Sequence, residues 1–400
     1  MPSKYPEFRD RPIRSFYKMR GAPVHSVMLV RTEEEALRYP CGDIELGFCE
    51  DDGFVTNLAF DHTLQHYSEE YEETQGFSPT FNRFHERLAK ELIERYDLHG
   101  KRIIEIGCGK GDFINMLCEL GGNRGLGVDP AYRADRDPFK NPNVQFLTEL
   151  YGQKHVSHGA DFICCKMTLE HIPDVTEFVR IVRSSVPPAS DAVVFFQIPE
   201  VRRVLSDVAF WDIYYEHCSY FSRGSLARVF RRAGFDVHDV WTDYDDQYLM
   251  IEAYPAENGQ VVSPPLPQEE SVQTLSQEVD AFSRIVERRI ADWRTYLKRR
   301  HAQGDRIALW GGGSKAVAFL TTLDIRAEVR YAVDINPHKA GTWLVGTGQQ
   351  VVQPSFLQTY DPQVVIVMNS IYRDEIARDL AALGLSPQLV MIDEDPTKLA

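Results

Sequence analysis

The stretch Ile103-Ile104-Glu105-Ile106-Gly107-Cys108-Gly109-Lys110-Gly111 decides the fold of this 400-residue chain. A short apolar run, typical of a buried parallel strand, leads directly into three closely spaced glycines and then into a helical pattern. A second apolar run, Gly125-Leu126-Gly127-Val128-Asp129, ends on a carboxylate about 20 residues further along. This order of strand, glycine turn, helix and acidic strand end predicts an α/β domain that binds a nucleoside-containing cofactor.

The spacing within the glycine turn favours S-adenosylmethionine over a dinucleotide as that cofactor. The glycines follow the pattern G-x-G-x-G, whereas a dinucleotide-binding turn carries G-x-G-x-x-G. Glu105 lies just ahead of Gly107, where its carboxylate can hold the ammonium group of the methionine portion. Asp129 is placed to bind the ribose hydroxyl groups. A glycine-rich turn that serves packing alone is the alternative interpretation.

The composition argues against several classes of partner. The net charge of −15 disfavours nucleic acid, which requires a basic face. No run approaches the ~20 apolar residues of a membrane helix, and the first residues, 1–20, lack the apolar core of a signal peptide. The seven cysteines include the adjacent pair Cys164-Cys165 in an apparent strand and do not form a disulfide framework. We expect a cytoplasmic protein that acts on a small molecule, and the composition leaves its oligomeric state open.

The chain is long enough for two or three domains. Residues 1–78 alternate short apolar runs with turns, for example Ser26–Val30 and Gly53–Thr56, and predict a small β-rich N-terminal lobe. Residues 79–257 begin with helical periodicity over Thr80–Tyr96 and then alternate strands with helices. This second region is the expected cofactor-binding core.

The alternation in the core predicts a doubly wound, mainly parallel sheet that binds ligands at the carboxyl ends of its strands. Seven strands are expected, at Arg102–Ile106, Gly125–Asp129, Asn143–Leu147, Ala160–Cys165, Ala192–Ile198, Phe235–Trp241 and Gln247–Tyr254.

A third region, residues 258–400, follows a segment rich in Pro, Gln, Glu and Ser and opens with a long helical stretch near 270–300. It contains a second glycine turn, Gly311-Gly312-Gly313-Ser314-Lys315-Ala316, and Asp334 ends the next strand. Taken alone, this G-x-G-x-x-A pattern supports NAD binding in a Rossmann-like domain. We favour a substrate phosphate at the helix N-terminus beside Lys315, and a turn used only for packing is a further alternative.

A dense polar and aromatic segment, Trp211–Phe221, follows the fifth core strand and carries candidate catalytic groups. His217 titrates near neutral pH and can remove a proton from a carbon beside a carbonyl group. Tyr214 or Tyr215 can stabilise the resulting enolate, and Glu216 can orient the imidazole or bind a substrate hydroxyl. The alternative is that the aromatic residues are core anchors and that His217 is a structural histidine.

In these motifs the chain resembles the three-part S-adenosylmethionine-dependent C-methyltransferases that act on nucleotide-linked keto-deoxysugars and related natural-product intermediates. The resemblance covers nearly the whole chain. It rests on the 103–111 turn, which is similar to motif I of class I methyltransferases, and on four further motifs. These are Tyr67-Ser68-Glu69-Glu70-Tyr71-Glu72, Leu169-Glu170-His171-Ile172, Tyr214–Phe221 and Val333-Asp334-Ile335-Asn336-Pro337-His338-Lys339-Ala340-Gly341.

The resemblance implies a class I methyltransferase core with a Rossmann-like C-terminal domain, and it implies roles for individual residues. The implied catalytic residues are His217 as the base, with Tyr214 and Glu216. The implied cofactor contacts are Tyr67, Tyr71, Glu105, Gly107, Gly109, Gly111, Asp129, Pro130, Met167, Glu170 and His171. The implied substrate contacts are Tyr215, Gly313, Ser314, Lys315, Asp334 and Asn336. The competing functions are a small-molecule O- or N-methyltransferase and an NAD-dependent protein.

One departure from the family concerns the N-terminal lobe. Family members usually hold a structural zinc there with two pairs of cysteines, in a tetrahedral thiolate site. In this chain Asp52 stands where the second cysteine of the pair that begins with Cys49 would be, and Cys41 is the only other cysteine of the lobe. We therefore predict no zinc and a lobe held together by packing.

Overall fold

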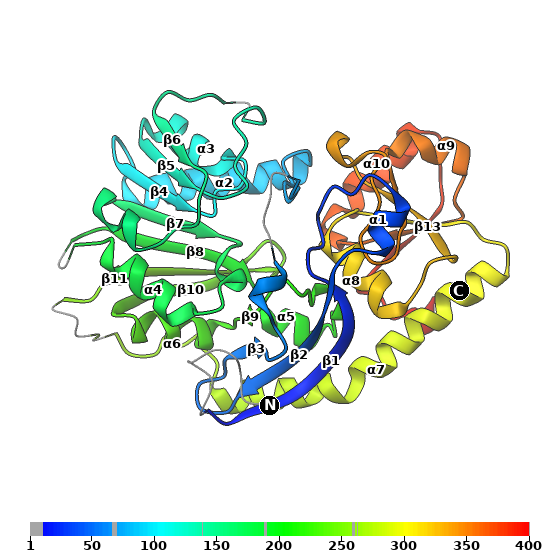
Figure 1. The fold of residues 1–400 in the computed structure, drawn as a ribbon, viewed down its shortest axis with the longest axis horizontal. Coiled ribbons are helices and arrows are strands. Elements are labelled where there is room, and N and C mark those ends of the chain that lie inside the picture. The colour runs from blue at the N-terminus through cyan, green and yellow to red at the C-terminus, as the bar shows by residue number, and fades with distance from the viewer. Residues whose placement is uncertain are drawn as a thin grey trace.

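The computed structural model describes residues 11–65, 70–137, 139–187, 190–257, 261 and 263–399. Within these ranges the chain forms three sheets, of four, seven and five strands. In Figure 1 the seven-stranded sheet lies in the cyan and green part of the chain, and the five-stranded sheet lies in the orange and red part. The blue N-terminal strands run between these two parts. No helix in the described ranges has the length and apolar character needed to cross a bilayer.

The seven-stranded sheet confirms the predicted core. Its strand order is β10-β11-β8-β7-β4-β5-β6, with parallel pairing from β8 to β6 and an antiparallel β10–β11 hairpin at one edge. The strands are β4 Arg102–Ile106, β5 Arg124–Val128, β6 Val144–Leu147, β7 Phe162–Lys166, β8 Val193–Pro199, β10 Phe235–Asp243 and β11 Tyr248–Pro255. Each lies within about two residues of its predicted bounds, because the sheet is buried on both faces and its apolar runs are continuous.

Helices cover both faces of this sheet. They are α2 Pro79–Tyr96, α3 Asp112–Gly121, α4 Val175–Ser184 and α6 Arg223–Arg232. The short helix α5, Val201–Ser206, instead packs in the apolar cluster that contains Phe16 and Phe282. The adjacent cysteines of β7 show the two-sided burial, since Cys164 packs in the cluster that includes α2 and Cys165 packs in the cluster that includes α4 and α6. Successive side chains of a strand point to opposite faces, so both thiols are buried in apolar layers.

The N-terminal sheet has the order β1-β2-β3-β9. Its strands are β1 Ile13–Pro23, β2 Cys41–Cys49, β3 Val55–Asn57 and β9 Ser219–Tyr220, and the short helix α1 spans Glu33–Leu37. Strand β9 belongs to the core in sequence, so the candidate catalytic segment is joined to the lobe by backbone pairing. The apolar run Ser26–Val30 does not form a continuous strand of this lobe: Met28 and Val30 make only isolated bridges, because their partners, Tyr71 and Trp343, lie on different parts of the chain.

The C-terminal part begins with the long helix α7, Val272–Ala302, which leads into a parallel five-stranded sheet of order β14-β13-β12-β15-β16. The strands are β12 Ile307–Trp310, β13 Val329–Val333, β14 Gln350–Val352, β15 Val364–Val367 and β16 Gln388–Met391, and the helices are α8 Ser314–Leu323, α9 Leu357–Tyr360 and α10 Arg373–Ala382. One apolar cluster joins the N-terminal strands to α7 and α8, for example through Phe16, Phe282 and Leu320. The lobe therefore packs on the C-terminal part as well as on the core.

An ionic network stands where the family's zinc site would be. The Asp52 carboxylate pairs with Arg11 at 2.5 Å and with Arg232, while Arg228 donates to the Asp52 carbonyl oxygen at 2.8 Å. Burial alone would raise the pKa of Asp52, but the hydrogen bond from Arg11 and the charge of Arg232 outweigh it and lower the pKa.

The two cysteines of the lobe cannot share one metal ion. Cys41 and Cys49 are the first and last residues of β2, and an extended strand of that length separates them by roughly 26 Å. The expectation that packing alone holds the lobe is therefore incomplete, because Asp52 also connects it to helix α6 through two arginines.

The substitution Asp52→Asn tests this network. Removing the charge leaves two arginines without their carboxylate, so we expect a loss of about 1–3 kcal/mol in the free energy of unfolding, measured by urea denaturation at pH 7. The pKa of Asp52 is lowered on folding, so its contribution is present above the unfolded-state pKa and disappears as the pH falls through the folded-state pKa. The exposed neighbour Asp51→Asn is the control, and equal stability of both variants would contradict the network's role.

Candidate active site

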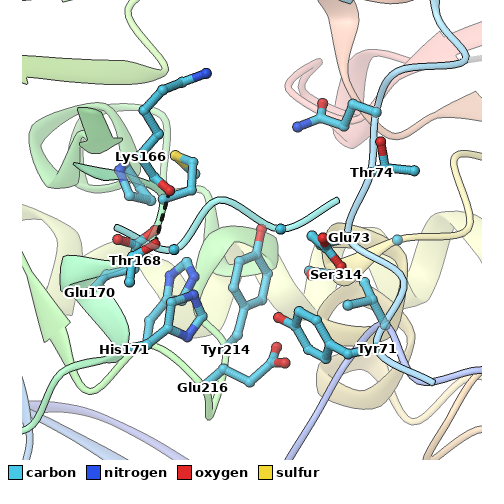
Figure 2. A pocket seen from close by; sticks show the side chains of 18 of the residues that line it. Tyr71, Glu73, Thr74, Lys166, Thr168, Glu170, His171, Tyr214, Glu216 and Ser314 are labelled. Atoms are coloured by element: carbon cyan, nitrogen blue, oxygen red, sulfur yellow. Dashed lines mark hydrogen bonds between the residues drawn. The ribbon is translucent and has the colours of Figure 1, made fainter. Parts of the chain in front are cut away.

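A cavity of about 1110 Å³ opens between the core, the N-terminal lobe and the C-terminal part. Its wall includes the carboxyl ends of β4, β5 and β7 and the glycine turns that precede α3 and α8. Figure 2 shows His171, Tyr214 and Glu216 gathered close together, with Lys166 directed away from them. Both glycine turns predicted from the sequence thus line the same cavity.

The first glycine turn has a backbone that only glycine adopts readily. Gly107 has φ 70° and Gly111 has φ 87°, and Gly111 caps α3. At Gly107 a Cβ would overlap Thr168, and at Gly109 it would lie 2.6 Å from Glu73 Oε1. The turn therefore offers bare backbone to the cavity, as close approach of a cofactor requires.

Two carboxylates lie beside this turn at the ends of adjacent strands. Glu105 Oε2 accepts from the backbone N–H of Ile114 at 2.9 Å, and Asp129 accepts from the N–H groups of Gly109 at 2.9 Å and Ala131 at 2.7 Å. Burial raises the pKa of Glu105 to about 8 and also raises the pKa of Asp129. A buried carboxylate with lone pairs left over suits a ligand ammonium or a ribose diol, so the residues fit S-adenosylmethionine.

The other expected cofactor contacts have mixed outcomes. Five of them line the same cavity: Tyr71, Pro130, Met167, Glu170 and His171. Tyr67 lies outside the described residues. Met167 has φ 51°, an uncommon conformation for a residue other than glycine, and its N–H donates to Gln197 O at 2.7 Å at the end of β7.

His217 lies in the cavity wall with a side chain that is almost fully buried. Its ring is 4.7 Å from the Tyr214 ring and 4.9 Å from the His171 ring, centroid to centroid. Nδ1 has no hydrogen-bond partner among the described residues. Burial, followed by the nearby His171 and Lys315, holds the pKa of His217 well below its usual value. The imidazole is therefore neutral at physiological pH and has a free lone pair that can accept a proton.

Glu170 is a buried carboxylate close to His217. It is 1% exposed, and neither of its carboxylate oxygens has a hydrogen-bond partner among the described residues. Burial raises its pKa to about 8. Glu170, His171 and His217 each offer one donor atom within 4.8 Å of the others, which is also the donor set of a metal site. The absence of a metal remains a prediction.

Glu216 does not orient His217, as one expectation had it. Its carboxylate accepts from Ser26 and lies 3.4 Å from His25 Nδ1, and both partners belong to the N-terminal lobe. Burial alone would raise the pKa of Glu216, but the hydrogen bond from His25 and the charge of His171 outweigh it and lower the pKa. Glu216 therefore holds the lobe against the catalytic segment.

The two tyrosines of the segment have different surroundings. Tyr214 lines the cavity and donates to Asp212 Oδ1 at 2.6 Å. Tyr215 does not line it: its hydroxyl accepts from Asp61 N at 2.9 Å, and its ring packs on Phe60 and against Gly42. The expected substrate contact of Tyr215 is thus wrong, because its side chain turns into the core of the lobe.

The second glycine turn supplies the opposite wall. Gly313, Ser314, Lys315, Asp334 and Asn336 all line the cavity. Asp334 Oδ2 accepts from Gly312 N at 3.1 Å and lies 3.3 Å from Lys339 Nζ. Lys315 pairs with Asp212 of the core, and Asp212 lies 3.6 Å from Arg203. Two lysines of the C-terminal part and Arg203 of core helix α5 therefore line the cavity on this side.

Sequence reasoning missed four residues of this site. His25 and Ser26 are 191 and 190 positions from Glu216, so no local pattern reveals their contact. Asp212 lies within the segment that we singled out, yet its pairing with Lys315 comes only from tertiary packing. Lys166 did carry a signal, because a lysine at the end of the apolar strand Phe162–Lys166 is unusual.

Comparison with known proteins assigns both large parts of the chain. Residues 81–240 match a methyltransferase domain, and residues 252–386 match a C-methyltransferase C-terminal domain. The chain belongs to the C-methyltransferase family. This C-methyltransferase is S-adenosylmethionine-dependent. The 311–316 turn lies within the matched C-terminal domain.

Individual relatives agree with this assignment. The C-methyltransferase NovU of Streptomyces niveus is 28% identical over 304 residues, which cover 72% of this chain and 71% of NovU. A ubiquinone biosynthesis O-methyltransferase of Neisseria meningitidis is 25% identical over 162 residues, 36% of this chain and 67% of the relative.

Among solved structures, a methyltransferase from Listeria monocytogenes aligns with a TM-score of 0.36 and 14% identity, over 44% of this chain and 100% of its own. The magnesium protoporphyrin IX methyltransferase of Synechocystis aligns with a TM-score of 0.35 and 15% identity, over 44% of this chain and 84% of its own.

The substitution Glu105→Gln tests the amino-group contact of this C-methyltransferase. Glutamine keeps an oxygen for the Ile114 N–H but removes the negative charge, so we expect S-adenosylhomocysteine to bind roughly tenfold more weakly. Isothermal titration measures the effect. Glu119→Gln, an exposed position on α3, is the control and should bind like the unmodified enzyme. An unchanged affinity of Glu105→Gln would remove Glu105 from the cofactor site.

Proposed function

We propose that the enzyme methylates the carbon beside a ketone in a nucleotide-linked deoxysugar or a related natural-product intermediate. The observation that carries this proposal is the neutral, buried His217 with an unpartnered nitrogen, which lies between the cofactor side of the cavity and the C-terminal turn. Methylation of carbon requires a base to remove a C–H proton, whereas many oxygen and nitrogen acceptors are nucleophilic already. The similarity to the C-methyltransferase NovU over 72% of the chain also supports carbon as the methylated atom.

In the proposed mechanism the chain contributes a base and a fixed geometry. The His217 imidazole takes the proton from the carbon beside the ketone, and the resulting enolate attacks in line. Bound S-adenosylmethionine supplies an activated methyl group on its sulfonium. The imidazolium formed at His217 lies beside Glu170, whose ionised form would stabilise the added charge. Tyr214 can donate to the enolate oxygen if its hydroxyl turns from Asp212, so Asp212 sets the resting position of that donor.

The C-terminal wall is proposed to hold the carrier part of the substrate. Ser314 begins the ten-residue helix α8, and Lys315 and Arg203 place cationic groups nearby. A diphosphate suits a helix N-terminus flanked by such groups. The proposed domain division is an N-terminal lobe 1–78, a core 79–257 and a substrate-binding domain 258–400.

The substitution His217→Asn is expected to abolish measurable turnover and to leave the affinity for S-adenosylhomocysteine within about twofold. Asparagine keeps a polar side chain of similar size but has no basic nitrogen. Product formation is followed by mass spectrometry with a nucleoside-diphosphate-linked keto-deoxysugar, and cofactor binding is followed by isothermal titration. His99→Asn, which is exposed, is the control. Normal turnover in His217→Asn would remove the base from this position.

An O-methyltransferase is the second candidate, favoured by the similarity of the core to a ubiquinone biosynthesis O-methyltransferase. Hydrogen exchange separates the two. In deuterated water with S-adenosylhomocysteine present, methyl transfer cannot occur, and a C-methyltransferase of this kind should exchange the C–H beside the ketone. The exchange should vanish in His217→Asn. An enzyme that methylates this substrate with S-adenosylmethionine but does not exchange the hydrogen with S-adenosylhomocysteine would be an oxygen or nitrogen methyltransferase.

A further inference from the structure

Lys166 places a buried positive charge in the cavity wall, apart from the catalytic segment. It is the last residue of β7, and its side chain is directed away from His171 and Glu170 (Figure 2). The residue is only 8% exposed. Its Nζ lies 2.9 Å from His85 Nε2 and 3.6 Å from the centre of the Phe113 ring. Helices α2 and α3 therefore enclose this ammonium group on the side away from the cavity.

Two carboxylates, Glu105 and Asp112, attract the Lys166 ammonium group, but neither makes an ion pair with it. No described carboxylate lies within the 4.0 Å ion-pair distance of Nζ, and only one of its three N–H donors has a hydrogen-bond partner among the described residues. That partner is neutral, since burial holds the pKa of His85 well below its usual value. An unpaired buried cation is costly, and such groups normally meet an anion. The open side of Lys166 faces the cavity, so the missing anion belongs to a ligand.

The position of Lys166 in the sheet indicates which anionic group the ligand carries there. Strands β7, β4 and β5 are neighbours in the sheet, and at their carboxyl ends they carry Lys166, Glu105 and Asp129 in that order. The bound cofactor has a carboxylate and an ammonium on one carbon atom, followed by the sulfonium and the ribose. A cation next to Glu105, on the side opposite Asp129, complements the carboxylate of this zwitterion.

We infer that Lys166 binds the carboxylate of the cofactor's amino-acid portion and that His85 positions the Lys166 ammonium group by accepting one of its hydrogens. The inference concerns cofactor recognition and is independent of the methyl acceptor. The expected contacts of Glu105 with the amino group and of Asp129 with the ribose leave the cofactor carboxylate unassigned, and Lys166 would bind it. The amino-acid portion of the cofactor would thus meet two side chains of opposite charge, Glu105 from β4 and Lys166 from β7.

The test compares two ligands that differ only in the carboxylate. Isothermal titration is carried out with S-adenosylhomocysteine and with its decarboxylated analogue, the S-adenosyl derivative of 3-thiopropylamine. The unmodified enzyme should prefer S-adenosylhomocysteine by a factor on the order of tenfold to a hundredfold, the range of a charge-assisted hydrogen bond. In Lys166→Met this preference should disappear, with the analogue bound as before. Lys166→Arg should restore most of it, and Lys90→Met, an exposed position on α2, should leave it unchanged.

Two results would overturn the inference. The first is an unmodified enzyme that binds both ligands equally, and this result does not depend on any variant folding. The second is a Lys166→Met variant that keeps the full preference. If Lys166→Met does not fold, as judged by circular dichroism, Lys166→Gln takes its place with the same two outcomes. A failed C-methylation assay would leave these binding results unaffected.

Discussion

One hydrogen-bonded group connects all three parts of the molecule. Glu216 of the core accepts from Ser26 of the N-terminal lobe, and Ser26 also hydrogen-bonds to Ser314 at 2.8 Å, where α8 of the C-terminal part begins. Backbone pairing of β9 with β3 lies a few residues away. The cavity exists because these contacts hold the lobe between the two α/β parts, so that both glycine turns face it.

The cavity wall contains three buried ionisable groups whose hydrogen-bonding capacity is not filled by the described residues. Both oxygens of Glu170 and Nδ1 of His217 have no hydrogen-bond partner there, and Lys166 has a partner for one of its three N–H donors. Such arrangements cost free energy in the empty protein, so they are retained where a ligand completes them. By contrast, the charges of the C-terminal wall are already paired: Lys315 with Asp212, and Lys339 with Asp334. The proposed phosphate-bearing substrate would therefore have to compete with protein carboxylates, whereas the proposed cofactor contact of Lys166 would displace no ion pair of the described residues.

In the N-terminal lobe a charged network lies at the turn where the family resemblance would place a metal ligand. The Asp52 carboxylate pairs with Arg11 and Arg232, and Arg228 donates to the Asp52 carbonyl oxygen. Two of these arginines come from α6 of the core, so the network ties the lobe to its neighbour and does not close within the lobe. Zinc thiolate bonds stabilise a small lobe locally. The arginine network instead makes the lobe's stability depend on the core.

The sequence by itself determined the seven core strands, the two glycine turns, the role of Glu105 and Asp129 as strand-end acids, and the segment that holds His217. These features are local, because strand burial and glycine conformations leave a pattern within a few residues. Only the tertiary structure decided that Tyr215 packs into the lobe and that Glu216 binds His25 and Ser26. It also decided that Lys166 makes no direct ion pair with a described carboxylate. Those outcomes depend on contacts between residues far apart in the chain, where burial and pairing are properties of the assembled cavity and leave no trace in sequence spacing.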